Sequence, residues 1–266
     1  MFYRKIPTSG EELPVIGLGT WQTFSRSSPA LVEVLRRFSA AGGRVIDTSP
    51  MYGDAEKVVG ELKTNVAKPF LATKVWTRGR ENGIDQMQQS RRLLHATQID
   101  LMQIHNLVDW QTHLRTLREW KSASHIRYIG ITHYQTGAFP QLAEIMRTEP
   151  IDFVQLPMSI ELPDAERMLL PLAQTKGIAV IVNRPFEEGK LLRAAKRKPL
   201  PPWAAEFDSK SWSELFLRYI VSHPAVTCVI PATGNPDHLS ENLRAGERRM
   251  LTMDERAKLR KLVTHR

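Results

Sequence analysis

The sequence predicts a parallel (β/α)8 barrel, the TIM barrel of the α/β class. Apolar, strand-like runs alternate with amphipathic helical segments along the 266 residues, and eight such pairs can be assigned. The length agrees, because barrels of this kind typically have about 250 residues. No internal repeat or interdomain linker interrupts the alternation. We therefore expect one domain over residues 1–266, with an N-terminal hairpin and a C-terminal helix.

The strands are expected as short apolar runs. A polar-tipped hairpin at 3–16 comes first, and the first barrel strand follows at 16–21. The remaining strands are expected at 44–48, 70–74, 101–105, 126–132, 152–156, 178–183 and 227–230. Continuous apolar character is typical of parallel strands, because they are buried on both faces.

Helices are expected between these strands. In the first of them, at 29–41, Leu31, Val34, Leu35 and Phe38 recur at helical spacing before a Gly-Gly pair. The other helices are expected at 56–63, 84–96, 110–122, 138–147, 164–175, 211–222, 237–244 and 254–263. A Pro- and Lys-rich excursion at 186–210 follows the seventh strand, and loops of that length are often functional.

Composition excludes several classes of protein. Hydrophobic residues make up 42% of the chain, with six Trp and nine Phe, which argues against disorder. No apolar run is long enough to span a membrane, and the N-terminus lacks the apolar core of a signal peptide. We therefore expect a cytoplasmic protein. The single Cys228 cannot form an internal disulfide, and its apolar neighbours predict a buried structural thiol.

The formal charge of +9 raises the question of an anionic partner. The densest basic clusters, at 193–198 and 256–261, are not interleaved with aromatic residues as a single-strand nucleic-acid surface would be. Solvated helix faces explain them better. We predict no nucleic-acid partner and no metal site, with a monomer as the default.

Four side chains with acid–base or charge chemistry stand at or just beyond three successive strand ends. Asp47 lies near the end of the strand at 44–48, and Tyr52 follows on the next loop. Lys74 and His105 end the next two strands. In α/β barrels the chemistry lies at this face, so we expect these side chains to meet. Singly, each has an ordinary interpretation, as a cap, a turn aromatic, a surface charge or a core histidine.

Together these residues support a proton-donating site. A phenol ionises at about pH 10, so it is a poor acid at neutral pH unless its surroundings tune it. The Lys74 cation would lower the pKa of Tyr52, and Asp47 would hold the ammonium by a charge-assisted hydrogen bond. His105 would hydrogen-bond the substrate oxygen or share the proton. Such a site suits a carbonyl oxygen that gains negative charge, but redox chemistry would need a cofactor.

These motifs and their order resemble the aldo-keto reductase superfamily along nearly the whole chain. The matching segments are Gly17–Trp21, Ile46–Thr48 with Tyr52-Gly53, Thr73–Trp76, Ile99–Leu101 with Ile104-His105, Ile129–Thr132, Val154-Gln155, and Ile230-Pro231 leading to Glu241-Asn242. The resemblance implies a catalytic tetrad, with Tyr52 as acid/base. Lys74 and Asp47 would tune it, and His105 would orient the substrate. It also implies NADPH as the hydride donor to an aldehyde or ketone.

The resemblance further implies a cofactor cradle along the strand ends. Its expected members are Gly19, Thr20, Trp21, Asp47, Thr132, His133, Gln155, Asn183, Arg184, Pro185, Phe186, Pro231, Ala232, Thr233, Gly234, Asn235, His238, Glu241 and Asn242. Within this set, the family's nicotinamide-binding Ser-Asn pair is replaced by Thr132-His133. Gln155 keeps the family's Gln.

Two parts of the cradle depart from the family pattern. Asn183 stands where an aromatic ring usually stacks on the nicotinamide, so Phe186 or Arg184 would have to cover the ring, or stacking is weak. Ala232 and His238 stand near positions where a Lys and an Arg usually bind the 2′-phosphate. The start of the last barrel helix can still bind an anion, so NADPH is expected and NADH is an open alternative. The ordinary interpretation of the Thr-Gly-Asn-Pro stretch at 233–236 is a solvated helix cap.

The substrate pocket is expected to be apolar and open. Trp21, Met51, Trp76 and Trp110 lie at or beyond strand ends and would form it together with His105, although core packing explains Trp76 and Trp110 equally well. The chain ends soon after its last helix, which implies an open pocket with broad tolerance. The excursion at 186–210 would fold over the cofactor, with Trp203 on it.

Two other functions compete with a carbonyl reductase. A nucleotide-binding regulatory or interaction protein could use the same barrel, because a fold alone does not fix function. The intact Asp–Lys–Tyr arrangement argues against it. A phosphate-handling isomerase would need a general base facing a phosphate, whereas Asp47 beside Lys74 looks like a tuning pair.

Overall fold

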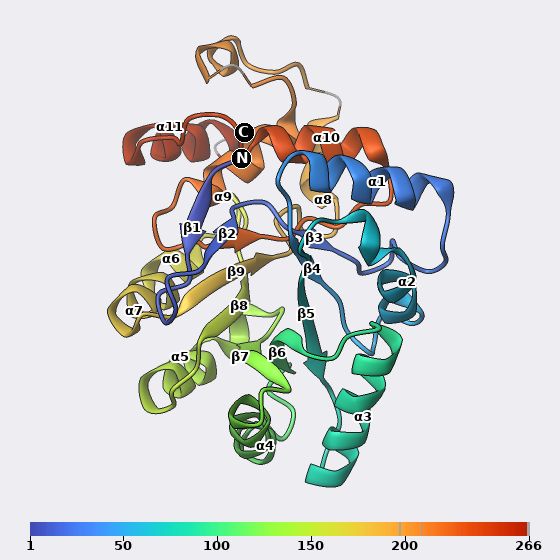
Figure 1. Ribbon diagram of the computed structural model, residues 1–266. Coiled ribbons are helices and arrows are strands. Elements are labelled where there is room, and N and C mark those ends of the chain that lie inside the picture. The colour runs from blue at the N-terminus through green and yellow to red at the C-terminus, as the bar shows by residue number, and fades with distance from the viewer. Residues whose placement is uncertain (197, 208, 265–266) are drawn as a thin grey trace.

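Eight parallel strands form the centre of the computed structural model, which describes residues 1–196, 198–207 and 209–264 (Figure 1). They follow one another around the sheet in chain order: β3 Leu18–Gly19, β4 Val45–Asp47, β5 Phe70–Val75, β6 Ile99–His105, β7 Ile126–Thr132, β8 Phe153–Pro157, β9 Ala179–Asn183 and β10 Cys228–Val229. Parallel bridges from Ile16 to Val229 and from Gly19 to Ala232 join the first and last strands. The predicted barrel is confirmed.

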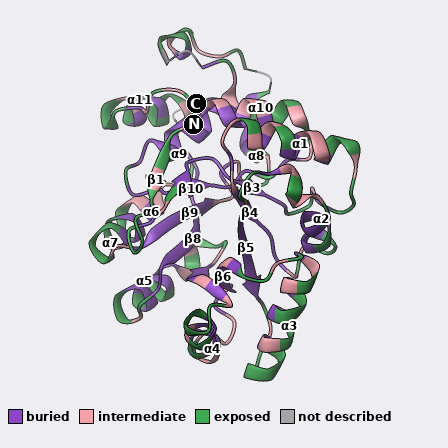
Figure 2. Cartoon of the chain, viewed as in Figure 1, coloured by how far each residue is buried: buried purple, intermediate pink, exposed green. Residues whose placement is uncertain are grey.

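Helices surround this barrel, as Figure 1 shows. They are α1 Pro29–Ala40, α2 Ala55–Leu62, α3 Arg80–Leu93, α4 Trp110–Ser122, α5 Phe139–Thr148, α6 Asp164–Arg167, α7 Leu169–Lys176, α8 Lys190–Ala195, α9 Trp212–Val221, α10 Pro236–Arg244 and α11 Met253–Thr264, with 3-10 turns η1 Lys63–Asn65, η2 Thr136–Ala138 and η3 Pro202–Phe207. Figure 2 shows the strands largely buried and the outward faces of the helices exposed. The helices therefore turn their apolar faces inward.

Helix α1 forms for reasons that are visible in its residues. Ser28 caps it by accepting a hydrogen bond from the backbone N–H of Leu31, and Pro29 occupies its first position. Its four predicted core residues are all buried. Beyond its end, Gly42 has a φ of +82°, a left-handed conformation that glycine adopts without strain.

The expected helix at 164–175 is wrong as one piece, because it divides into α6 and α7 around Met168. A proline inside a helix lacks a donor and clashes with the carbonyl four residues earlier. The break places Pro171 in the first turn of α7, where proline is tolerated.

The excursion at 186–210 contains α8 and η3, and its Arg197 and Asp208 lie outside the described residues.

The N-terminal hairpin, β1 Tyr3–Lys5 paired antiparallel with β2 Glu12–Pro14, covers one end of the barrel. Its Ile6 and Leu13 pack against interior residues of the strands, namely Val45, Phe70, Ala72, Leu101, Tyr128, Phe153, Ala179, Ile181, Cys228 and Ile230. Glu11 accepts hydrogen bonds from Arg127 and Tyr128, at the amino-terminal end of β7. This end is therefore filled, and the carboxyl ends of the strands are left for a site.

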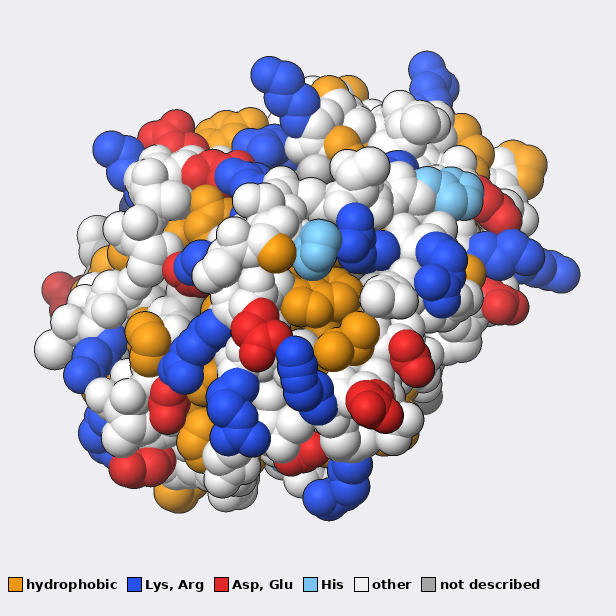
Figure 3. All heavy atoms as spheres, turned by 60° about the horizontal axis from the view of Figure 1, so that its bottom comes forward, with side chains coloured by type: hydrophobic (Ala, Val, Ile, Leu, Met, Phe, Trp, Pro, Cys, Tyr) orange, Lys and Arg blue, Asp and Glu red, His pale blue; other side chains and the backbone are white. Residues whose placement is uncertain are grey.

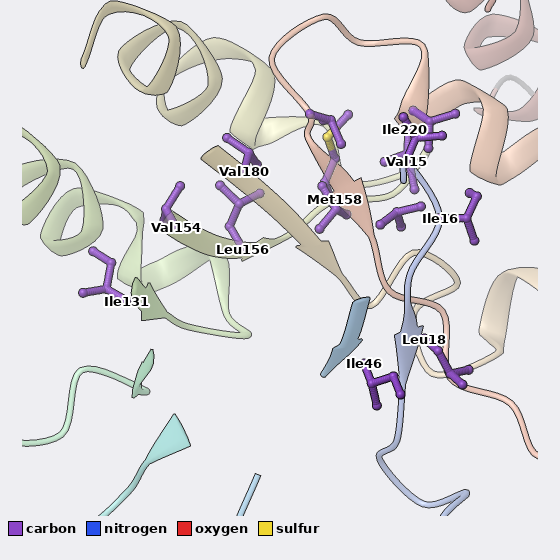
Figure 4. Close-up of a cluster of buried hydrophobic side chains, with 14 of the residues drawn as sticks. Val15, Ile16, Leu18, Ile46, Ile131, Val154, Leu156, Met158, Val180 and Ile220 are labelled. Atoms are coloured by element: carbon purple, nitrogen blue, oxygen red, sulfur yellow. The ribbon is translucent and has the colours of Figure 1, made fainter. Parts of the chain in front are cut away.

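A second hydrophobic cluster lies between the strands and the helices. Figure 4 shows part of it, including Val15 and Ile16 from the chain before β3, Ile46 from β4 and Ile220 from α9. The predicted burial of Cys228 is confirmed, since its side chain is fully enclosed. That burial raises the pKa of the thiol.

On the face of the molecule shown in Figure 3, the basic side chains do not gather into one patch. Figure 3 shows Lys and Arg side chains spread among acidic ones around a patch of hydrophobic side chains. Within the described residues, none of the helices combines the length and the apolar character needed to cross a membrane.

Candidate active site

The four predicted reactive side chains meet at the carboxyl ends of β4, β5 and β6. The Lys74 Nζ atom donates to Asp47 Oδ1 at 2.6 Å and to the backbone oxygen of Thr48 at 2.7 Å. The same Nζ lies 5.0 Å from the centre of the Tyr52 ring. The rings of Tyr52 and His105 are edge to face, with centroids 6.1 Å apart. The structure thus brings these four residues together.

Lys74 is a buried cation. Its side chain is fully enclosed, and this desolvation lowers its pKa, but the Asp47 carboxylate and Tyr52 outweigh that effect and leave the pKa raised. Lys74 therefore stays an ammonium at neutral pH.

Tyr52 keeps its proton. Burial raises the pKa of its phenol and Asp47 adds to this effect, while the Lys74 cation lowers the pKa without prevailing. The predicted lowering of the Tyr52 pKa by Lys74 is therefore present, but desolvation is the larger effect and leaves the pKa above its usual value. The phenol is therefore protonated at neutral pH, and it lies beside the Lys74 cation.

His105 is a neutral imidazole. Burial, the Lys74 cation and the proximity of His133 together lower its pKa from 6.5 to about 3. Its Nδ1 atom lies 3.1 Å from the hydroxyl oxygen of Ser49, a fully buried residue of the loop that carries Tyr52. The sequence analysis did not identify Ser49.

Asp47 also ties the reactive residues to the predicted cradle. Its second oxygen, Oδ2, accepts from Nε2 of Gln103 and from Nε2 of Gln155, each at 2.9 Å. Gln103 was missed by the sequence analysis, although a signal existed. It is a polar residue in an apolar strand, two positions before His105, and residues two apart share one face of a strand.

Gln155 joins further cradle residues. Its Oε1 accepts from the Thr132 hydroxyl at 3.1 Å and from the Asn183 amide at 3.2 Å. The other amide atom of Asn183, Oδ1, is buried without a hydrogen-bond partner. A buried acceptor without a donor suits a ligand that carries an amide N–H, as a nicotinamide does.

A stack of three side chains lies next to this group. The rings of His133 and Tyr134 are nearly parallel, 5.5 Å apart, and the Arg184 guanidinium lies 5.6 Å from the centre of the Tyr134 ring. Arg184 has a left-handed backbone, with a φ of +51°. Pro185 is buried, and Phe186 packs against the hydrophobic core. Tyr134, 42% exposed, has no place in the sequence-based site.

The strand ends opposite carry the remaining residues of the predicted cradle. The Gly19 N–H donates to the Pro231 oxygen at 3.2 Å, and Gly19 pairs with Ala232. Thr20 donates to the backbone oxygen of Asp47 through both its N–H and its hydroxyl, each at 3.1 Å. The segments around β3, β4 and β10 are thereby held together.

The phosphate site is expected at the amino-terminal end of α10. Asn235 caps the helix by accepting from the N–H groups of Asp237 and His238, at 2.8 and 3.4 Å. His238 is exposed, and Asp237 pairs with Arg37 at 3.0 Å. Thr233, like Asn242, is buried, Gly234 is partly buried, and Glu241 accepts from Ser213 at 2.9 Å.

The predicted substrate residues divide into two groups. Trp21, Met51 and Trp76 are 38%, 40% and 42% exposed, and the Trp76 ring lies 6.2 Å from that of His105. Trp110 is partly buried and packs against the hydrophobic core, as does Trp203. The exposed group therefore offers an apolar surface close to the reactive residues, and Trp110 follows the core-packing interpretation.

Comparison with known proteins places the chain in a family. A family model described as the aldo/keto reductase family matches residues 15–264. Methylglyoxal reductase YeaE of Escherichia coli is 27% identical over 253 residues, which cover 91% of this chain and 89% of that protein.

Solved structures share the fold. The holo form of an aldo-keto reductase from Bacillus halodurans has a TM-score of 0.81 at 24% identity, covering 98% of this chain and 96% of that one. An aldo/keto reductase from Klebsiella pneumoniae, in complex with NADP and acetate, has a TM-score of 0.80 at 24% identity, covering 96% and 93%. Because the family model spans nearly the whole sequence, the chain belongs to the aldo/keto reductase family.

Proposed function

We propose that this protein is an NAD(P)H-dependent carbonyl reductase, which reduces aldehydes or ketones to alcohols. The observation that carries the proposal is the meeting of Tyr52, the buried Lys74 and His105 at the strand ends, with Lys74 paired to Asp47 at 2.6 Å and 5.0 Å from the centre of the Tyr52 ring. Family membership supports oxidoreductase chemistry. The relative named methylglyoxal reductase supports small dicarbonyl compounds as a substrate class to test first.

The cradle fits a nicotinamide nucleotide. Asn183 Oδ1 is a buried acceptor without a partner, next to the amide of Gln155 and the hydroxyl of Thr132. These residues would hold the carboxamide, while the α10 end would hold the phosphates of NADPH or NADH and Asn242 the adenine. When bound, the reduced nicotinamide supplies the hydride that this chain lacks.

The chain's own residues manage the proton. Tyr52 donates its phenolic proton to the carbonyl oxygen as negative charge develops there. Lys74 stabilises the phenolate that remains, and Asp47 keeps Lys74 charged. His105 orients the carbonyl oxygen, and the exposed Trp21, Met51 and Trp76 contact the apolar part of the substrate.

The test is turnover by the purified protein. We expect oxidation of NADPH or NADH when methylglyoxal, a simple aldehyde or a ketone is supplied, measured by the loss of the reduced-nicotinamide absorbance. Tight nucleotide binding without turnover on any of these substrates would favour the regulatory protein instead.

The remaining expectations form part of the same proposal. They are a single domain over residues 1–266, a cytoplasmic location, a monomer and no nucleic-acid partner. Light scattering during size-exclusion chromatography measures the molar mass, and a dimer mass would contradict the monomer.

A further inference from the structure

Ser49 connects the loop that carries Tyr52 to the ring of His105. It lies between Asp47 and Tyr52 in the sequence, and its side chain is fully buried. Its Oγ atom lies 3.1 Å from His105 Nδ1 and accepts from the Met51 N–H at 3.3 Å. Its backbone oxygen accepts from the Tyr52 N–H at 3.0 Å.

The donors and acceptors around Ser49 Oγ determine the direction of its hydrogen bond with His105. The Met51 N–H can only donate, so Ser49 Oγ accepts there and retains one hydrogen of its own. A buried hydroxyl hydrogen needs an acceptor. If Nδ1 were protonated, Oγ would face two N–H donors and its own hydrogen would have none. The hydroxyl therefore donates to Nδ1.

This direction determines the tautomer of His105. A neutral imidazole carries one N–H, so an accepting Nδ1 places the hydrogen on Nε2. Within the described part of the chain, Nε2 of His105 makes no hydrogen bond to protein. The ring lies edge to face with Tyr52 and against the exposed Trp76. The free donor thus belongs to the side of the ring available to a substrate.

We propose that Ser49 is a positioning residue that holds His105 as the Nε2–H tautomer, so that a neutral histidine donates to the substrate carbonyl oxygen. The inference rests on the proposed carbonyl reduction for its purpose, but the tautomer itself does not depend on turnover. Without this bond the ring could place its hydrogen on Nδ1, and Nε2 would then present a lone pair to the oxygen and repel it.

Nitrogen-15 NMR of the full-length protein measures the tautomer directly. At neutral pH, we expect His105 to show an unprotonated, hydrogen-bonded Nδ1 and a protonated Nε2, with the resonances assigned by their loss in His105→Gln. A protonated Nδ1 in the wild-type protein would overturn the proposal, whatever the enzyme reduces. This measurement requires no variant of Ser49 to fold.

Two variants test the consequence. Ser49→Ala removes the donor, so we expect a mixed tautomer population and a fall in kcat of about 10-fold, the factor that one hydrogen bond of ordinary strength represents. Ser49→Thr keeps the hydroxyl and should restore both the tautomer and kcat. Wild-type tautomer populations in Ser49→Ala would overturn the proposal, and an accompanying loss of kcat would then be an effect of loop packing.

The proposal and the function on which it rests fail differently. If the wild-type protein shows the expected Nε2–H tautomer but reduces no carbonyl compound, the positioning by Ser49 stands and the proposed reaction fails. If it reduces carbonyls with Nδ1 protonated, the reaction stands and the role of Ser49 fails.

Discussion

A single carboxylate joins the acid–base residues to the cradle. Asp47 uses one oxygen for Lys74 and the other for the amides of Gln103 and Gln155. All four side chains are buried. Since an unpaired polar atom in the interior costs free energy, each side chain restricts the next. The residues proposed to move the proton and those proposed to hold the cofactor are therefore one hydrogen-bonded network.

Replacing Gln103 tests that network. Gln103→Leu removes a donor to Asp47 and an acceptor that Gln155 uses at 3.1 Å. We expect the free energy of unfolding to fall by about 1–3 kcal/mol, measured in urea, because a buried polar group loses its partner. Nucleotide affinity should also fall, because Gln155 is held less firmly. The matched control is Gln88→Leu on the exposed surface of α3, and equal effects of the two changes would contradict the network.

At the residue scale, the sequence predicts those side chains whose position in a strand marks them. Asp47, Lys74 and His105 each stand near the carboxyl end of an apolar run, so their meeting follows from the barrel. Ser49 and Tyr134 lie on loops, and their partners depend on loop conformation, which residue spacing does not encode.

At the scale of elements, α10 is the helix proposed to bind the nucleotide phosphates. Its first N–H groups are already capped by Asn235, and its first turn carries Asp237 paired with Arg37. A 2′-phosphate is bound best by a free cation or free N–H groups. His238 is exposed on this turn and is the side chain left to contact the phosphate.

His238→Ala is expected to weaken NADPH binding more than NADH binding, because only NADPH carries the 2′-phosphate. The dissociation constants of NADPH and NADH, obtained by titration of the protein fluorescence, measure both affinities. His95→Ala, at another exposed histidine, is the matched control. Equal losses for the two nucleotides in His238→Ala would remove His238 from the phosphate site.

The elements themselves were largely predictable, and the exception has a local cause. Parallel strands appear as apolar runs and helices as periodic ones, so β7 at Ile126–Thr132 matches its prediction residue for residue. The helix expected at 164–175 also carried its warning, since Pro171 lies inside it. The prediction followed the helical spacing of the apolar residues and not the proline. In the structure the helix is interrupted at Met168, which separates α6 from α7.

At the scale of the whole molecule, the two ends of the barrel differ in what occupies them. The hairpin fills one end with Ile6 and Leu13, while the reactive residues gather at the other. On the hairpin side, the partly buried Arg4 donates to the backbone oxygens of Val221, His223 and Val226. Buried histidines at both ends, His223 and His105, make stability depend on pH.

The lowered pKa of His223 determines whether stability rises or falls with pH. Burial and the nearby Arg256 lower its pKa from 6.5 to about 4. The unfolded chain therefore binds a proton in this range that the folded protein does not bind, so the contribution to stability is complete above pH 6.5 and falls as the pH drops toward 4. His105 acts in the same direction down to its pKa of about 3.

Urea unfolding at a series of pH values measures this effect. His223→Asn keeps a side-chain acceptor near the Ala225 N–H but cannot be protonated, so we expect a smaller loss of stability between pH 6.5 and 4 than in the wild-type protein. His95→Asn is the matched control at an exposed histidine. A His223→Asn protein with the wild-type slope would show that His223 is protonated in the folded state.

The most direct test of the whole account is the kinetics of Tyr52→Phe, which removes one oxygen atom from the site. The account predicts that kcat for carbonyl reduction falls by about 100-fold or more, because the proton donor is lost. The dissociation constant of the nucleotide should stay within a few-fold of the wild-type value, because Tyr52 is not among the cradle residues. A Tyr52→Phe protein that retains wild-type turnover would contradict the central claim and remove Tyr52 from the reaction.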